Sequence, residues 1–194
     1  MAKVAIVGGG AAGLTASLFT AKNGLETVVF DTDETWLHSA HLFNYPGIES
    51  LDGTRYLEIL RTQVDRFGVD RRQGTAVESV EPDDDGYVLE TDEGTTEASY
   101  VVLATGANRD LAEDIGCAFD GEIVSVDVTM ETSLDGLYAT GAMVRDQEWQ
   151  AVISSGDGAA AALNILSRER GEGFHDFDTP ADADEAFSAV TESE

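Results

Sequence analysis

The sequence predicts a three-layer α/β domain, with helices on one face of a parallel sheet and a small antiparallel meander on the other. Apolar runs without polar alternation are typical of strands that a parallel sheet buries on both faces. Segments with apolar residues at helical spacing separate these runs. We expect buried strands at 3–8, 27–30 and 100–104, shorter strands at 122–126 and 136–139, and helices at 11–23, 54–67 and 150–168.

The first two strands and the helix between them form one crossover unit. Leu14, Leu18 and Ala21 share a face of the helix, and Gly24 stands just past its end. The unit has the length of a parallel strand–helix–strand crossover. An irregular stretch at 32–52 follows it.

The meander is predicted from three short runs joined by turn residues. A strand near 75–80 leads into three aspartates and Gly86, the run 87–89 pairs back, and residues 95–99 return after a Glu-Gly turn. The last of these strands leads directly into the buried run at 100–104, which places the meander beside the main sheet.

Acidic residues dominate the composition: 38 Asp and Glu against 11 Lys and Arg give a net charge of −27 over 194 residues. Nucleic acid is therefore excluded as a partner, because its phosphates would be repelled. Self-repulsion in such a chain weakens at molar salt, where the screening length falls to about 3 Å, so we hypothesise a halophilic source. The alternative is an ordinary acidic protein, and a melting temperature that is unchanged from dilute buffer to molar salt would favour it.

The length and the apolar pattern of the chain predict how many domains it has and where it is located. We expect one domain at 1–170 and an acidic, loosely ordered tail at 171–194. No apolar run approaches the roughly 20 residues that cross a bilayer, so we expect no membrane contact and a cytoplasmic location. Cys117 is the only cysteine, which excludes an internal disulfide and a Cys-x-x-Cys pair, and no metal-ligand cluster emerges.

A glycine loop directly after the first strand carries the strongest chemical signal. Residues 8–13 contain Gly-x-Gly-x-x-Gly, in which Gly8 permits a tight turn, Gly10 lets a diphosphate approach the backbone, and Gly13 lets the helix pack on the strand. The helix start offers N–H groups and a partial positive charge to the phosphates. Asp31, at the end of the second strand, would accept hydrogen bonds from the ribose. This acid favours FAD or NAD over NADP in a Rossmann-like fold.

Four further motifs carry a resemblance to a known family. They are Asn-Tyr-Pro-Gly at 44–47, Tyr-Val-Val-Leu-Ala-Thr-Gly-Ala at 100–107, Thr-Ser-Leu-Asp-Gly-Leu-Tyr-Ala-Thr-Gly at 132–141 and Gln-Ala at 150–151 leading into Gly-Asp-Gly-Ala-Ala at 156–160. In content and order, these motifs resemble the FAD domain of the thioredoxin reductase-like (pyridine nucleotide-disulfide oxidoreductase) family. The resemblance covers most of residues 1–170 and implies FAD bound in extended form across the carboxyl ends of the strands.

The resemblance also implies which residues meet the cofactor. Ala76 and Val77 would lie beside the adenine, Asn44 near the flavin ring, and Gln150 with the Ala151 N–H at the pyrimidine edge of that ring. A helix start there would stabilise negative charge on a reduced flavin. The full predicted set is Gly8, Gly10, Ala11, Ala12, Gly13, Asp31, Thr32, Asn44, Ala76, Val77, Ala104, Thr105, Gly106, Gly141, Ala142, Gln150 and Ala151.

The chain departs from the family pattern in four places. Only about fifteen residues separate Gly106 from the expected strand at 122–126, so the NADPH domain that the family inserts there does not fit. The redox dithiol of that domain is absent as well. Ala142 replaces the acid of a family Gly-Asp pair, a loss for which Asp146 or Asp157 would have to compensate. The glycine pair that normally follows the second strand is also missing, and Thr35-Trp36 lies in that region.

Catalytic residues are weakly indicated. Trp36, His38, His41 and Tyr45 would line the flavin face, and either histidine would be a candidate for proton exchange with the ring. The alternative is that these are surface or packing residues. Trp149 would cover the ring or serve in ordinary packing.

We expect FAD-dependent oxidoreduction or electron transfer, with a separate redox protein or a small molecule as the unidentified electron donor and acceptor. Two alternatives stay open. One is a non-catalytic FAD- or nucleotide-binding module, or a subunit of a larger redox complex; the other is a small NAD-binding protein. A homodimer is expected by family analogy alone.

Overall fold

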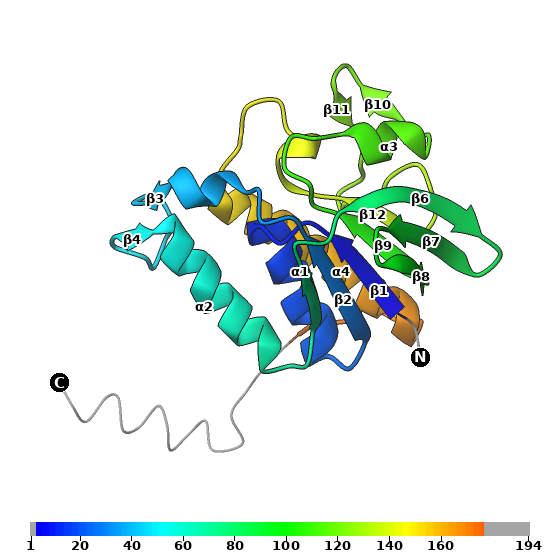
Figure 1. Ribbon diagram of the computed structural model, residues 1–194, viewed down its shortest axis with the longest axis horizontal. Helices are drawn as coiled ribbons and strands as arrows, with labels where there is room; N and C mark the ends of the chain where they lie inside the picture. Colours follow the sequence, from blue (N-terminus) through cyan, green and yellow to red (C-terminus); the bar gives the residue numbers. More distant parts are fainter. Residues whose placement is uncertain (1–2, 177–194) are drawn as a thin grey trace.

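The computed structural model describes residues 3–176, and its centre is a five-stranded parallel sheet (Figure 1). The strand order is β12-β9-β1-β2-β5, so the chain moves outward from β1 in both directions. The strands are β1 (Lys3–Val7), β2 (Glu26–Asp31), β5 (Asp70–Gln73), β9 (Tyr100–Leu103) and β12 (Leu137–Ala139). The predicted parallel sheet is confirmed.

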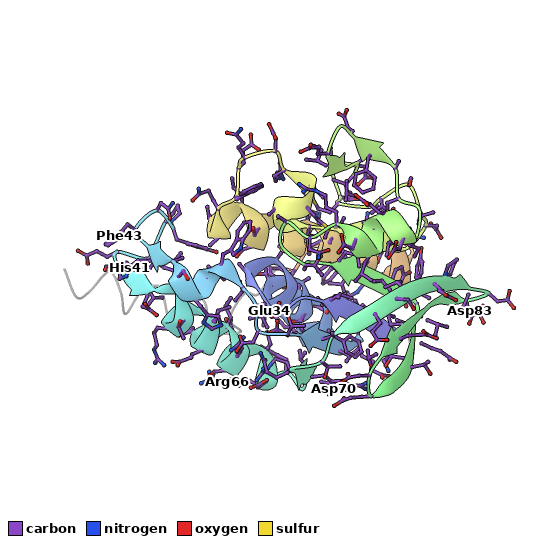
Figure 2. All side chains as sticks on the ribbon, turned by 45° about the horizontal axis from the view of Figure 1, so that its top comes forward. Glu34, His41, Phe43, Arg66, Asp70 and Asp83 are labelled. Carbon is purple, nitrogen blue, oxygen red and sulfur yellow. The ribbon has the colours of Figure 1, made fainter. Side chains whose placement is uncertain are left out.

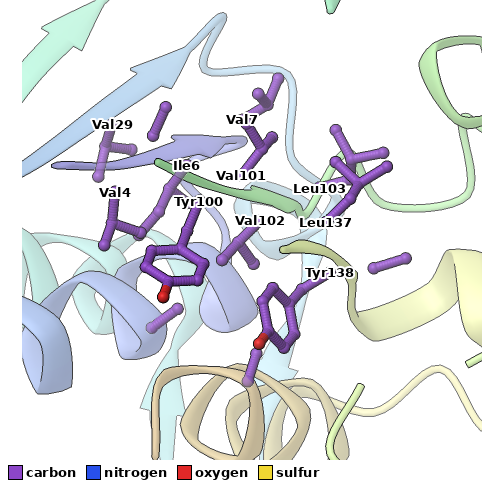
Figure 3. Packing of buried hydrophobic residues seen from close by; sticks show 14 of the residues in the cluster. Val4, Ile6, Val7, Val29, Tyr100, Val101, Val102, Leu103, Leu137 and Tyr138 are labelled. Atoms are coloured by element: carbon purple, nitrogen blue, oxygen red, sulfur yellow. The ribbon is translucent and has the colours of Figure 1, made fainter. Parts of the chain in front are cut away.

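The central strands are apolar because helices and meander cover both of their faces. In β1, Val4, Ala5 and Ile6 have no exposed surface. Tyr100 and Tyr138 point from their strands toward the helical layer, where the Tyr138 hydroxyl donates to Asn164 Oδ1 at 2.6 Å (Figure 3). The aromatic rings thus fill the space between sheet and helices and keep their hydroxyls paired.

Three helices form the second layer: α1 (Ala11–Lys22), α2 (Gly53–Asp65) and α4 (Ala151–Arg170). The closest approach is between α1 and α4. A methyl group at Gly158 would lie 2.1 Å from the backbone oxygen of Ala12, so only glycine permits this contact. Gly158 is therefore a packing requirement of the helix pair.

The third layer is the predicted antiparallel meander, β6 (Val77–Asp83), β7 (Gly86–Thr91) and β8 (Gly94–Ala98). It covers the face of the sheet opposite α1 and α4 (Figure 1). Tyr87 and Leu89 are buried beneath it, and the Tyr87 hydroxyl donates to the Asp135 backbone oxygen at 2.6 Å. Burial raises the pKa of Tyr87 to about 12. The three-layer architecture is confirmed.

Several elements differ from the sequence-based expectation. The strand expected near 75–80 begins at Val77, within the predicted meander, and the main sheet gains β5, which the sequence analysis did not predict. The strand expected at 122–126 is only two residues long and pairs in a separate hairpin. The remaining short elements are η1 (Trp36–Ser39), β3 (His41–Leu42), β4 (Leu51–Asp52), α3 (Asp110–Asp114), β10 (Phe119–Asp120), β11 (Ile123–Val124) and η2 (Gly141–Val144).

The last described residues return to the domain surface. Gly171 ends α4 with φ 68°, the backbone N–H of Phe174 donates to Ser167 Oγ at 3.0 Å, and Asp176 pairs with Lys22 at 2.8 Å. Most of the predicted tail, residues 177–194, lies outside the described residues, so the boundary at 170 stays a prediction. None of the helices in the described range is long and apolar enough to cross a membrane.

Candidate functional site

A cavity of about 840 Å³ opens where β1, β2 and β9 reach their carboxyl ends. Its wall includes Gly8, Asp31 and Ala104, one from the end of each strand, and the first turns of α1 and α4. The order of the strands switches at β1, because the chain adds β2 on one side of β1 and later adds β9 on the other side. Such a switch point is the usual ligand site of an open α/β sheet.

The three motif glycines answer different requirements. Gly8 has φ 114°, and a methyl group there would lie 2.2 Å from the Ala104 backbone oxygen. A methyl group at Gly13 would lie 1.9 Å from the Gly8 backbone oxygen. At Gly10, by contrast, the nearest atom is Thr35 Oγ1 at 3.6 Å, and the added group would enter the cavity. Gly8 and Gly13 therefore serve the fold, while Gly10 keeps ligand space open.

Two helices begin at this cavity without a side-chain cap. Gly10 precedes α1 and Gln150 precedes α4, and neither makes a side-chain cap bond within the described part of the chain. Both residues line the cavity. The first N–H groups of both helices, with their partial positive charge, are thus directed toward one cavity. This arrangement suits an anionic ligand such as a diphosphate.

Asp31 is held in place by residues that the sequence analysis did not identify. Its Oδ2 accepts from Arg61 Nη2 at 3.2 Å and from Gln73 Nε2 at 3.0 Å, and its Oδ1 accepts from the backbone N–H of Asp33 at 3.1 Å. Arg61 also contacts Asp33, and this ion pair together with His38 lowers the pKa of the Asp33 carboxyl. Asp31 therefore presents a fixed carboxylate at one end of the cavity.

Another part of the cavity wall is held together by a contact between distant segments. Asn44 Nδ2 donates to Gln150 Oε1 at 2.6 Å, which joins the loop after β3 to the start of α4. Both residues, together with Ala151 and Ala142, line the cavity. The predicted flavin residues are thus brought together around the start of α4.

Asp157 does not restore the acid that Ala142 replaces. Its buried carboxylate accepts from Arg145 Nη2 at 2.5 Å and lies 3.3 Å from the backbone N of Gly141, which donates to it. These bonds hold the η2 turn against α4. The acid is therefore engaged within the protein, and the methyl group of Ala142 remains at the cavity wall.

Of the seventeen predicted cofactor residues, all except Gly13 line the cavity. Among the weak catalytic candidates, His41 lines it as well. His38 instead bonds to Thr54 and Asp33, and Tyr45 lies in a separate shallow hollow with its ring 5.6 Å from that of Tyr56. Among the described residues, no group of three or more His, Cys, Asp or Glu is placed to hold a metal ion.

The segment after β9 adds cavity residues that no motif indicated. Asn108, Leu111 and Asp114 line the cavity from α3 and the turn before it. Arg109 ties this turn to η2, since its Nε donates to the Met143 backbone oxygen at 3.1 Å. The five-residue helix α3 thus lines the cavity in the segment where the family inserts its NADPH domain.

Fold and site together define a dinucleotide-binding α/β domain of the FAD type. The family model for pyridine nucleotide-disulphide oxidoreductases matches residues 49–159, and a model for an FAD binding domain matches residues 3–41. The chain belongs to the pyridine nucleotide-disulphide oxidoreductase family. It is an FAD-binding flavoprotein, which confirms the predicted cofactor and fold.

Curated relatives and a solved structure agree with this placement. The chain is 28% identical over 169 residues to the thioredoxin reductase of Mycolicibacterium smegmatis and 29% identical over 173 residues to that of Helicobacter pylori. These matches cover 85% and 86% of this chain but 51% and 52% of the relatives, so the chain spans about half their length. A thioredoxin reductase structure from Gloeobacter violaceus shares the fold, with a TM-score of 0.82 and 21% identity over 92% of this chain and 99% of that one.

Proposed function

We propose that this chain is an electron-transfer flavoprotein whose FAD exchanges electrons with a separate donor and acceptor. The observation that carries the proposal is the pair of helix starts, α1 and α4, that face one cavity without side-chain caps. FAD needs positive charge at two points, its diphosphate and the pyrimidine edge of its reduced ring. The two helix starts meet these two needs.

Each part of FAD has residues of matching chemistry. The amides of Ala11 and Ala12 hold the diphosphate against the space left by Gly10. The Asp31 carboxylate accepts from the adenosine ribose, and Ala76 and Val77 flank the adenine. FAD in an extended form would thereby reach from Asp31 to the start of α4.

At the flavin end, the Ala151 N–H and the Gln150 amide face the pyrimidine edge of the ring. Bound FAD supplies the redox chemistry. The start of α4 lowers the free energy of a negative charge that develops on the ring, which favours reduction. The Asn44–Gln150 bond fixes the orientation of the Gln150 amide, so it acts as a positioning contact.

The electron donor is proposed to be a separate molecule. The described residues place only α3 and a short hairpin between β9 and β12, and the sequence has a single cysteine. A dithiol relay of the kind that requires two cysteines is therefore not available in this sequence. The relatives are named for the reduction of thioredoxin. By analogy, we propose that the flavin of this chain passes electrons to a further protein, which in turn reduces a protein disulfide.

The test is purification, spectroscopy and one matched pair of glycine variants. We expect yellow protein with one FAD per chain by mass spectrometry. Gly10→Val is expected to lower FAD affinity about 100-fold or more, because it displaces two or more bonds to charged phosphate oxygens worth about 1.5–3 kcal/mol each. Gly156→Ala, on the exposed side of α4 with no atom within 4 Å of the added methyl group, is the control and should bind FAD normally. Retained FAD in Gly10→Val protein would contradict the proposal.

A non-catalytic FAD module is the second candidate, and the Ala142 position favours it. The cavity wall there lacks the acid that the resemblance led us to expect, and Asp157 is turned toward Arg145. Addition of NADH, NADPH or dithionite to the yellow protein separates a nicotinamide-dependent reductase from a binding module or a carrier. Bleaching by dithionite alone supports a module or a carrier for a protein donor, while bleaching by a nicotinamide within seconds supports a reductase.

A further inference from the structure

Two tryptophans from distant parts of the chain meet at the cavity. Trp36 begins η1 and Trp149 precedes α4, yet their ring centroids are 5.3 Å apart with an interplanar angle of 46°. Both rings line the cavity. They are the only tryptophans in the sequence.

The pair is exposed in a way that core packing does not explain. Trp36 is 61% exposed and Trp149 is 43% exposed, although each contacts the other. A tryptophan buries up to about 250 Å² when it is fully covered, so two rings left at a cavity wall forgo a large apolar contribution. A planar apolar ligand in the cavity would recover it.

Hydrogen bonds fix the segments that carry the two rings. Thr35 caps η1 by accepting from the Leu37 backbone N–H at 3.4 Å. The indole Nε1 of Trp149 donates to the Arg145 backbone oxygen at 3.2 Å, and Arg145 is itself paired with Asp157. The rings are therefore positioned before any ligand arrives, which lowers the entropic cost of stacking on one.

The position along the cavity selects the flavin ring as the planar group. Trp149 directly precedes Gln150, which stands at the start of α4 and accepts a hydrogen bond from Asn44. Trp36 follows Thr35, whose Oγ1 lies near the diphosphate space at Gly10. In the binding mode proposed above, the adenine would lie beyond the diphosphate near Asp31, which would leave the isoalloxazine as the ring within reach of both indoles.

We propose that Trp36 and Trp149 form an aromatic cover that contacts the isoalloxazine ring of bound FAD and shields it from solvent. The inference rests on the proposed function, since it requires FAD in this cavity. An indole in contact with an excited flavin donates one electron to it and receives that electron back, so emission is lost without net reaction. The wild-type holoprotein is therefore expected to show weak flavin emission.

The experiment measures flavin emission per bound FAD in holoprotein that carries Trp36→Phe, Trp149→Phe or both. Phenylalanine keeps an aromatic ring for folding but is a poor electron donor. Each single variant should raise the emission several-fold, and the double variant should raise it most, at unchanged FAD content. Phe43→Leu is the control, because Phe43 is 71% exposed and stacks on His41 in the nearby hairpin (Figure 2). Phe43 is not among the residues that line the cavity.

The outcomes separate the two proposals. Absence of FAD from the wild-type protein overturns the proposed function. If FAD is present and the double variant emits as weakly as wild type, the cover is overturned while the proposed function stands. A rise in Phe43→Leu equal to that in the tryptophan variants would also overturn the cover, since the effect would then not depend on contact with the indoles.

Discussion

The starts of α1 and α4 differ from the start of α2 in how their first N–H groups are used. At α2, Asp52 Oδ1 accepts from the backbone N–H groups of Thr54 at 2.9 Å and Arg55 at 3.2 Å. At α1 and α4, the residues before the helix are Gly10 and Gln150, and both line the cavity. A side-chain cap at a helix start stabilises the fold, whereas an uncapped start at a cavity leaves its backbone N–H groups free to bind an anion. Substitutions should separate the two uses.

The largest effect is expected where the glycine loop supports the fold itself. Gly13→Val should destabilise the protein by more than the ~1–3 kcal/mol typical of overpacking, because its Cβ meets backbone at 1.9 Å and backbone does not yield. Urea unfolding measures the loss. An unchanged midpoint would show that α1 shifts without cost and would remove the distinction between Gly13 and Gly10.

The next effect concerns the carboxylate at the far end of the cavity. Asp31→Ala should weaken FAD binding about tenfold or more, since a charged hydrogen bond contributes about 1.5–3 kcal/mol. Arg61 keeps Asp33 as a partner in this variant, which limits the damage to the fold. Calorimetric titration of apoprotein with FAD measures the change. If Asp31→Ala bound FAD as tightly as wild type, the Asp31 carboxylate would be fully engaged by Arg61 and Gln73 and would not contact FAD.

A proline tests the start of α4 without breaking the helix. Ala151 is the first residue of α4, where proline is well tolerated, and Gln150 has φ −121° and ψ 141°, which suit a residue before proline. Ala151→Pro removes one N–H donor, and about a tenfold loss of FAD affinity is expected. The melting temperature of the apoprotein should stay within about a degree or two of wild type. Wild-type affinity would indicate that this N–H does not contact FAD.

The smallest effect is expected at the capped start. Asp52→Ala should cost about 1 kcal/mol of stability through loss of the α2 cap, with no change in FAD affinity. The pair Asp52→Ala and Ala151→Pro should thus give opposite patterns, one in urea unfolding and the other in titration. A matching loss of FAD affinity in Asp52→Ala would break the comparison.

The sequence predicted the interior of the sheet but missed one of its edges. β1 and β9 are continuous apolar runs because both of their faces are covered. β5 reads Asp-Arg-Arg-Gln and pairs with β2 alone, so its polar side chains reach partners at the rim. Arg71 pairs with Asp65 at 2.6 Å, and Arg72 lies over the Phe30 ring at 5.2 Å. An edge strand stabilised by ion pairs has no apolar signal.

The site divides in the same way. The glycine loop was predicted because the motif itself fixes its geometry, and Ala104, Thr105 and Gly106 were predicted from the contiguous motif that carries the family resemblance. Arg61 and Gln73 were not, since they reach Asp31 from 30 and 42 residues away. Their role depends on the packing of α2 and β5 beside β2, which no local pattern records.

The short path from β9 through α3 to the β10–β11 hairpin has a consequence for engineering. The path is tied down at both ends, by Arg109 on the Met143 backbone oxygen and by the Ala118 N–H on Ser133 Oγ at 2.9 Å, and it adds no strand to the main sheet. Domains are readily grafted at exposed connections whose removal leaves the scaffold intact. Outside the α3 residues that line the cavity, we therefore expect this path to be the place where an added domain would least disturb the main sheet.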